Sequence, residues 1–314
     1  MYSLTLRMMF AIGVLFGIIY LVIVLLGGES FTFNLLIALV ILLIQYLISP
    51  KIVEWSMAVR YVSEDEEPEL HRIVEDLAEK AGIPKPKVGI SEIPIANAFA
   101  FGRSIRDGRV VVTRQILKLL TREELKAVLG HEISHIKHRD MIVTTLVSVI
   151  PMVLYNMAIL FMHFGGGDRE NNNVGPIIGL LMLVLYFISN LIVLFISRTR
   201  EYMADYGSVN LGNPPEHLAS SLYKLVYASA IIPEEQKTQV SGLKAFFLND
   251  PNSAEREIIE LSQIDMNRNF KIDRSELEQI KYAKVKISAG EKIMELLTTH
   301  PNMLKRIKKL SEYV

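Results

Sequence analysis

The sequence contains no cysteine and no excess of either charge, with 34 lysine and arginine residues against 34 aspartate and glutamate residues. The absence of cysteine excludes disulfide bonds, thiolate-bound zinc and a cysteine nucleophile, and it fits a reducing compartment. The balanced charge lacks the basic surplus of nucleic-acid-binding proteins and the charge excess of disordered chains. We therefore expect no nucleic-acid partner.

Charged residues are also scarce in two long stretches of the chain. Residues 1–50 contain only Arg7 and Glu29, and the charges of residues 141–197 are confined to residues 168–170. The remaining chain carries nearly all the charged side chains. Long apolar stretches joined to charged ones are typical of membrane segments attached to a water-exposed domain.

Each stretch contains two uncharged runs, which cover residues 8–26, 31–48, 141–164 and 174–197. A helix rising ~1.5 Å per residue needs roughly 20 residues to cross the ~30 Å hydrocarbon core of a membrane. The last two runs exceed that length, and the first two are close to it. The sequence thus predicts four transmembrane helices, arranged as one hairpin in residues 1–50 and a second in residues 141–197.

Lysine and arginine residues near the ends of these runs fall mainly on one side of the predicted membrane. That side receives Arg7, Lys51, Arg60, Lys126, Lys137, Arg139, Arg198 and Arg200. The other side receives Arg169. Because positive residues concentrate in cytoplasmic loops, we expect a multi-pass protein of the cell membrane with both termini and both polar stretches, 51–140 and 198–314, in the cytoplasm.

The polar stretches show helical and strand patterns. Apolar spacing predicts a helix over residues 70–78 that ends at Gly82, and another that starts in a capping box at Thr121 and continues to residue 140. Short strands are predicted at residues 87–90, 98–101 and 110–112. Residues 198–314 are predicted to be mostly helical. The expected fold class is a mainly α membrane protein with a cytoplasmic, zincin-like α+β domain that contains a small β-sheet.

The second predicted helix contains the segment HEISH, with His131, Glu132 and His135. Two histidines four residues apart lie on one helix face, so both imidazoles can reach one zinc ion at ~2.0–2.1 Å. Glu132 then lies beside the metal, where it can act as general base for an activated water. The same pattern also occurs on solvated helix faces, so a third ligand has to separate the two possibilities.

A carboxylate is the better candidate for that third ligand. His138 lies seven residues after His131, ~10 Å along the helix, which is too far for one metal. The hairpin that follows brings Glu201 to the same side of the membrane as His135. Glu201 could bind the metal, as in His₂Glu zinc sites. Asp205, one turn later, could accept a hydrogen bond from a ligand imidazole.

Four short blocks of the sequence form a recognisable set by their order and spacing. They are ANAFAFG at 96–102, REELKAVLGHEISHIKHRD at 122–140, SRTREYMAD at 197–205 and THPNMLKRI at 299–307. Through these blocks the chain resembles the HtpX-type integral-membrane zinc metallopeptidases, relatives of the CAAX prenyl proteases. His138 and Phe101 depart from the family pattern, which usually has asparagine and threonine there. Neither departure touches a ligand position.

The resemblance implies one zinc ion per subunit, bound by His131, His135 and Glu201, with Glu132 as the general base. It also implies a stress-response peptidase of the cell membrane that cleaves misfolded or damaged membrane proteins by attack of zinc-activated water. Unfolded membrane proteins are therefore the expected partners. The sequence leaves the oligomeric state and the cleavage specificity open.

Two further segments have candidate roles in such a peptidase. An extended substrate could pair with the predicted edge strand through backbone groups, which makes Asn97, Ala98 and Phe99 candidate substrate-binding residues. His300, with Arg306 as its partner, is a candidate hydrogen-bond donor to the oxyanion of the tetrahedral intermediate.

Residues 232–290 fit the resemblance least and contain an EF-hand-like pattern, D-x-N-x-N-F-x-I-D-x-x-E, at residues 265–276. Position six is Phe270, where such loops need glycine for a left-handed turn. We therefore expect Phe270 to resist the turn and the loop not to bind calcium.

The predicted organisation has four parts. Residues 1–50 form a transmembrane hairpin, residues 51–140 a zincin part with the edge strand and the HEISH helix, and residues 141–197 a second transmembrane hairpin. Residues 198–314 form a helical part that carries the third ligand and a variable insertion at about 232–290.

The expected function is a zinc endopeptidase. One alternative is a CAAX-type processing protease, which usually needs more membrane helices to form a chamber. The other is a non-enzymatic membrane adaptor with a structural zinc, although three protein ligands leave a coordination position open.

Overall fold

The computed structural model describes residues 43, 46–48, 50–164, 174–233, 248, 254–283 and 289–314. The chain divides into two units by its internal contacts. We call them the polar unit (Ser49–Met141 and Arg200–Val314) and the apolar unit, which includes Ile142–Thr199. Of the first two predicted membrane helices only residues 43 and 46–48 are described, so the predicted hairpin at 1–50 lies outside the described residues.

A four-stranded sheet with the order β1-β2-β4-β3 lies in the polar unit. Its strands are β1 (Val59–Tyr61), β2 (Lys87–Ser91), β3 (Ala98–Phe101) and β4 (Arg109–Thr113). The inner strands β2 and β4 are parallel, and each outer strand is antiparallel to its neighbour. β3 therefore forms an edge of the sheet, as predicted. The sequence does not predict β1, because three residues are too few to show an apolar alternation.

The first half of the polar unit also contains three helices, one between β1 and β2 and two after β4. They are α3 (Pro68–Ala81), α4 (Arg114–Leu119) and α5 (Arg122–Lys137). α3 ends as predicted at Gly82, whose φ of 69° is left-handed and suits glycine. α5 begins with the predicted capping box, in which Glu124 Oε2 accepts from the Thr121 N–H at 2.8 Å. The prediction that this helix continues to residue 140 is wrong, because Arg139 adopts a left-handed φ of 56° that ends α5 at Lys137.

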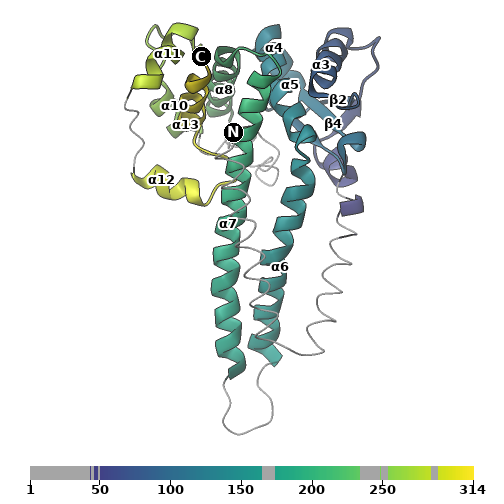
Figure 1. Ribbon diagram of the computed structural model, residues 1–314, viewed down its shortest axis with the longest axis vertical. Coiled ribbons are helices and arrows are strands. Elements are labelled where there is room, and N and C mark those ends of the chain that lie inside the picture. Colours follow the sequence, from purple (N-terminus) through teal and green to yellow (C-terminus); the bar gives the residue numbers. More distant parts are fainter. Residues whose placement is uncertain are drawn as a thin grey trace. The chain divides into compact units, whose positions relative to one another are not determined.

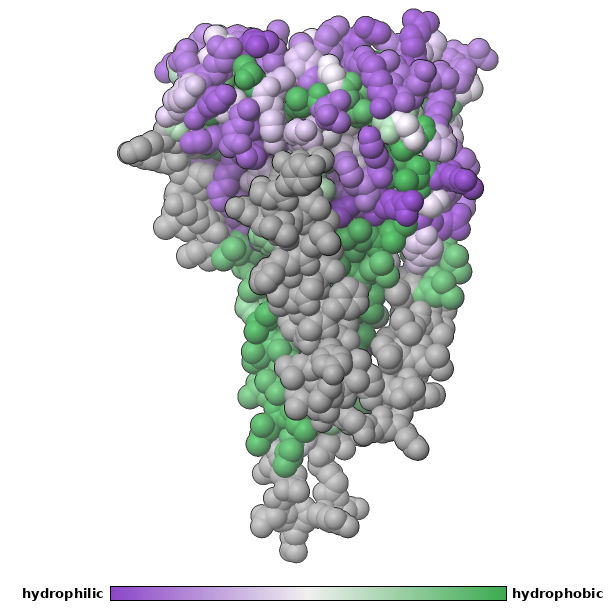
Figure 2. All heavy atoms as spheres, viewed as in Figure 1, coloured by the Kyte–Doolittle hydropathy of each residue, from purple (hydrophilic) through white to green (hydrophobic). Residues whose placement is uncertain are grey.

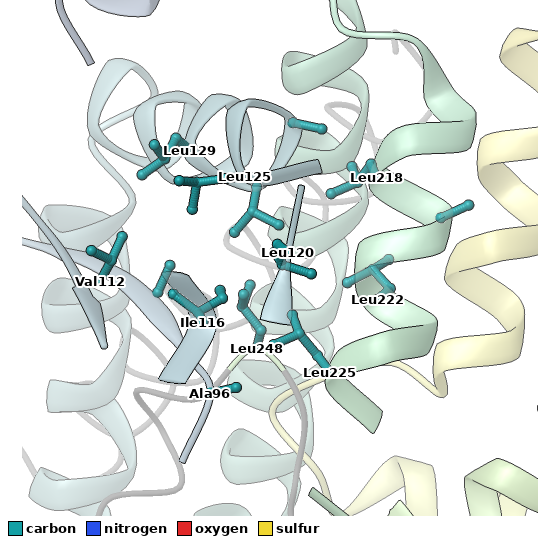
Figure 3. Packing of buried hydrophobic residues seen from close by; sticks show 14 of the residues in the cluster. Ala96, Val112, Ile116, Leu120, Leu125, Leu129, Leu218, Leu222, Leu225 and Leu248 are labelled. Atoms are coloured by element: carbon teal, nitrogen blue, oxygen red, sulfur yellow. The ribbon is translucent and has the colours of Figure 1, made fainter. Parts of the chain in front are cut away.

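The second half of the polar unit is helical, as predicted. Its helices are α8 (Pro215–Ala230), α10 (Ala254–Leu261), α11 (Arg274–Tyr282), α12 (Ala289–Leu296) and α13 (Met303–Leu310). Helix α8 packs against α5, and the labelled leucines of the two helices, Leu125 on α5 and Leu218 and Leu222 on α8, lie in one buried cluster (Figures 1 and 3). Complete burial of each such side chain stabilises the fold by ~1.5–3 kcal/mol, so this cluster holds α5 in place.

The apolar unit contains, among its described residues, most of α6 (Asp140–Phe164) and the first part of α7 (Val174–Asn210). The two helices approach closely at Gly179, where an added Cβ would lie 2.5 Å from the Met162 side chain. Both are long and apolar enough to cross a membrane, in agreement with the predicted helices at 141–164 and 174–197. Their coloured surface in Figure 2 is mostly hydrophobic.

Candidate metal centre

Helices α5 and α7 bring three potential metal ligands together in the polar unit. His131 and His135 come from α5 and Glu201 from α7, and one ligand atom of each lies within 4.8 Å of the others. The helices can approach because the facing residue is Gly207, where an added Cβ would lie 1.9 Å from Ser134 Oγ. The structure thus places the three predicted ligands in one cluster.

The distances within this cluster fit a tetrahedral metal ion. The two Nε2 atoms of His131 and His135 are 3.0 Å apart, and they lie 3.7 and 3.6 Å from the nearer oxygens of Glu201. Zinc with bonds of ~2.0–2.1 Å holds tetrahedral ligands about 3.4 Å apart. Three ligand atoms at these separations therefore suit a zinc ion.

Each histidine uses its other ring nitrogen to bind an aspartate. Nδ1 of His131 donates to Asp205 Oδ1 at 2.9 Å, and Nδ1 of His135 donates to Asp140 Oδ2 at 2.6 Å. With the proton on Nδ1, the lone pair of Nε2 is free for a metal. Asp205 occupies its predicted place, whereas sequence reasoning missed Asp140.

Arg306 of α13 neutralises part of the negative charge at this centre. Its side chain is fully buried and donates to Asp205 at 2.9 and 2.6 Å, and it lies 3.1 Å from Glu201 Oε2. A buried carboxylate is costly without a charge partner. Arg306 therefore supports one ligand, Glu201, directly and a second, His131, through Asp205.

Burial lowers the pKa of His131, against the effect of its hydrogen bond to Asp205. The lowered pKa favours the neutral imidazole that a metal needs.

Glu132 lies beside the ligands without belonging to their cluster. Burial raises its pKa to about 7, against the effect of nearby His135 and of a hydrogen bond from the backbone of Ala100 on β3. The edge strand thus runs past the carboxyl group of Glu132. A group with a pKa near neutrality can both take up and release a proton under physiological conditions.

The side chains of the candidate substrate-binding residues on and next to β3 are buried, so only their backbone could meet a substrate. Ala98 and Phe99 on β3 are buried at 1% and 4% exposure, and the Asn97 side chain accepts from the Leu248 N–H at 3.0 Å. β3 pairs with β4 on one side through Ala98–Phe101. A substrate strand would therefore meet the other edge of β3 through main-chain groups.

His300 also lies at the centre, in the segment between α12 and α13. Its Nδ1 is 3.4 Å from Glu201 Oε2, and its Nε2 has no hydrogen-bond partner among the described residues. The ring thus contacts a metal ligand through Nδ1 and can donate through Nε2. His138, in contrast, donates from Nδ1 to the Ser134 carbonyl oxygen at 2.9 Å and stays outside the ligand cluster, as expected from its spacing.

The comparisons with known proteins agree with this geometry. The family model described as Peptidase family M48 matches residues 64–314. The chain belongs to this family. A protease HtpX homolog of Methanothermobacter thermautotrophicus is 55% identical over 229 residues, which cover 72% of this chain and 86% of that protein. A protease HtpX homolog of Moorella thermoacetica is 35% identical over 313 residues, covering 97% and 92%. The HtpX resemblance predicted from the sequence blocks is thereby confirmed, and the chain is a protease of family M48.

A solved structure extends the likeness to the fold. The crystal structure of S. mikatae Ste24p covers 99% of this M48 chain, and the chain covers 67% of Ste24p, with a TM-score of 0.54 and 16% sequence identity. At this identity the match shows a shared fold only.

The EF-hand-like loop of this M48 chain differs from its prediction in one respect. Phe270 does adopt the left-handed turn, with φ of 60°. Its ring packs against Tyr227 of α8 at a centroid distance of 4.8 Å, which offsets the cost of the conformation. The argument that Phe270 would resist the turn is therefore wrong, because a contact from a distant helix decides its conformation.

We still expect calcium to raise the melting temperature of the chain only slightly, because the loop is already ordered by its own hydrogen bonds. Asp265 accepts from the N–H groups of Asn269 and Phe270, and Glu276 accepts from those of Met266 and Asp273. Thermal unfolding at micromolar calcium measures the effect. A large, saturable rise that disappears in Glu276→Gln would contradict this expectation.

Proposed function

We propose that the chain is a membrane-bound zinc endopeptidase that cleaves misfolded or damaged membrane proteins. The observation that carries the proposal is the convergence of His131, His135 and Glu201, with Glu132 beside them and the edge of β3 passing the same point. A closed structural zinc site has four protein ligands. The described residues offer three, which supports a site that admits water and substrate.

The three ligands would hold one zinc ion, which acts as a Lewis acid and lowers the pKa of water. Glu132 would take a proton from the attacking water and deliver it to the leaving amine. The aspartates on the two histidines would keep both rings in the tautomer that binds metal. His300 would donate to the oxyanion of the tetrahedral intermediate, because its ring lies against Glu201 and its Nε2 has no hydrogen-bond partner among the described residues.

Pairing through the backbone of β3 supports a broad choice of substrates. Main-chain hydrogen bonds contribute affinity irrespective of the side chains in an added strand. Because the side chains of Ala98 and Phe99 are buried, they would select little at this edge. Only an extended segment can pair in this way, so unfolded chains would be accepted and folded ones excluded.

Exposed apolar side chains on α7 support the proposed placement in a membrane. Ile177, Leu180 and Phe187 of α7 are exposed at 67%, 61% and 56%. Exposed apolar surface of this extent is unfavourable in water and typical of contact with lipid. We infer four transmembrane helices in the cell membrane, with both termini and the polar unit in the cytoplasm, from the excess of lysine and arginine on one side.

Thiol labelling in intact cells tests this topology, because each introduced cysteine is the only one in the chain. Ser30→Cys and Asn172→Cys are expected to react with a membrane-impermeant reagent. Ser63→Cys and Ser253→Cys are expected to react only after lysis. The reverse labelling pattern would overturn the orientation.

Replacing His300 with alanine is expected to lower kcat by ~10²–10³, the typical cost of one oxyanion donor, with little loss of zinc. The measurement compares kcat and zinc content with those of His217→Ala, which removes a histidine of α8 outside the ligand cluster. Loss of zinc from His300→Ala would show instead that His300 holds the metal site together.

Cleavage assays on the detergent-purified chain test the proposed function. An unfolded membrane protein should be cut, its folded form should be spared, and a chelator should stop the reaction. Cleavage confined to prenylated C-terminal peptides would favour a processing protease. Zinc binding without any cleavage would favour a structural zinc in an adaptor.

A further inference from the structure

Asp140 connects a metal ligand to the neighbouring helix. Its Oδ2 accepts from His135 Nδ1 at 2.6 Å, and its Oδ1 forms an ion pair with Arg200 of α7. Asp140 and Arg200 are buried at 7% and 3% exposure. Arg200 immediately precedes Glu201 in the chain. The Asp140–Arg200 pair therefore connects Asp140, which contacts the ligand His135, to the backbone segment that carries the ligand Glu201.

The backbone between α5 and α6 is shaped for this contact. Asp140 follows His135 by five residues, and in a continuous helix these side chains would point roughly 140° apart around the axis. The left-handed φ of 56° at Arg139 breaks the helix there and brings the carboxylate to the imidazole. This conformation is unfavourable for a residue other than glycine. Unfavourable backbone geometry retained at a site suggests that the site needs it.

Arg200 also stabilises the broken helix end itself. Its guanidinium donates to the His138 carbonyl oxygen at 2.8 Å, and His138 is the residue that caps α5. The last carbonyl groups of a helix lack partners within the helix and attract cations. Both the His138 carbonyl and Asp140 are contacted by the terminal nitrogen Nη2 of Arg200, which lies farther from the backbone than the ammonium of a lysine in its place would.

The two histidines are therefore supported in the same manner from different helices. Asp205, held by Arg306, orients His131, and Asp140, held by Arg200, orients His135. On the basis of the proposed metal site, we infer that Asp140 and Arg200 are positioning residues. They keep the proton of His135 on Nδ1 and fix its Nε2 toward Glu201.

Zinc affinity of the purified full-length chain tests this role independently of catalysis. Asp140→Asn keeps the size of the side chain but can present an amide N–H to Nδ1, which moves the imidazole proton to Nε2. We expect Asp140→Asn and Arg200→Lys to bind zinc ~10–100-fold more weakly than the parent, the usual effect of losing a residue that orients a ligand. Competition with a chromogenic zinc chelator measures the affinity. Asp140→Glu, which restores the carboxylate, is expected to recover part of it.

Lys224→Met is the matched control, because it removes a different, partly buried ion pair, between Lys224 and Glu124 at 2.7 Å. It is expected to bind zinc as the parent does, even if it unfolds at a lower temperature. Parent affinity in a folded Asp140→Asn or Arg200→Lys variant would overturn the inference. An equal loss of affinity in Lys224→Met would also overturn it, since any destabilisation would then suffice. If the parent itself bound no zinc, the proposed function would fail instead.

Discussion

Replacing Glu132 with glutamine is expected to abolish peptide hydrolysis while zinc remains bound to the chain. Glu132 lies beside His131 and His135 but outside the ligand cluster, and an amide cannot take a proton from water. Loss of a general base typically lowers a rate by ~10²–10⁴. Zinc stoichiometry and initial cleavage rate, measured on one detergent-purified sample, check this expectation.

Glu123→Gln provides the matched control on the same helix. Glu123 lies in the first turn of α5 and is exposed, so its replacement should change neither zinc content nor rate. A Glu132→Gln variant that cleaves as fast as Glu123→Gln would exclude Glu132 as the base. Loss of zinc from Glu132→Gln would show that the carboxylate contributes to metal binding.

Replacing Glu201 with glutamine should have the opposite signature, in which zinc is lost first and activity follows. The amide is a poorer ligand than a carboxylate, and the substitution removes one negative charge that lies 3.1 Å from the Arg306 guanidinium. We expect zinc affinity to fall by more than the ~10–100-fold that is typical of replacing an orienting residue. Excess zinc should restore part of the activity, which it cannot do for Glu132→Gln.

Asp205→Asn calibrates the Glu201 result, because Asp205 touches the His131 ring and not the metal position. Its zinc affinity should fall within the ~10–100-fold range, between the parent and Glu201→Gln. Equilibrium dialysis of the variants side by side measures the order. If Glu201→Gln retained zinc like the parent, the third ligand would lie elsewhere, and Asp205 would be the first residue to test.

Local signals in the sequence were sufficient to predict most of the metal centre. The spacing of His131 and His135 follows from helix geometry alone, and the capping box at Thr121 marks where that helix begins. Glu201 followed from a longer-range argument, because a membrane hairpin returns the chain to the side from which it left. The structure places all three residues in one cluster.

The parts that the sequence did not reveal depend on contacts between distant segments. No glycine or proline marks the break at Arg139, so the helix was predicted to continue to residue 140, and no role was predicted for Asp140. The partner that holds Asp140 is Arg200, which follows only after the hairpin. An acidic residue directly before a long apolar run, and an arginine directly after one, are the signals that could have revealed this pair. Phe270 is a similar case, since its turn is supported by Tyr227 from another helix.

Stepwise removal of zinc from the purified chain tests the central claim most directly, namely that this metal centre hydrolyses peptides. Zinc content and the cleavage rate of an unfolded substrate are measured at each step, and again after zinc is returned. We expect the rate to fall in proportion to zinc content and to recover with it, up to one ion per chain. A zinc-free chain that cleaves at the parent rate would contradict the claim.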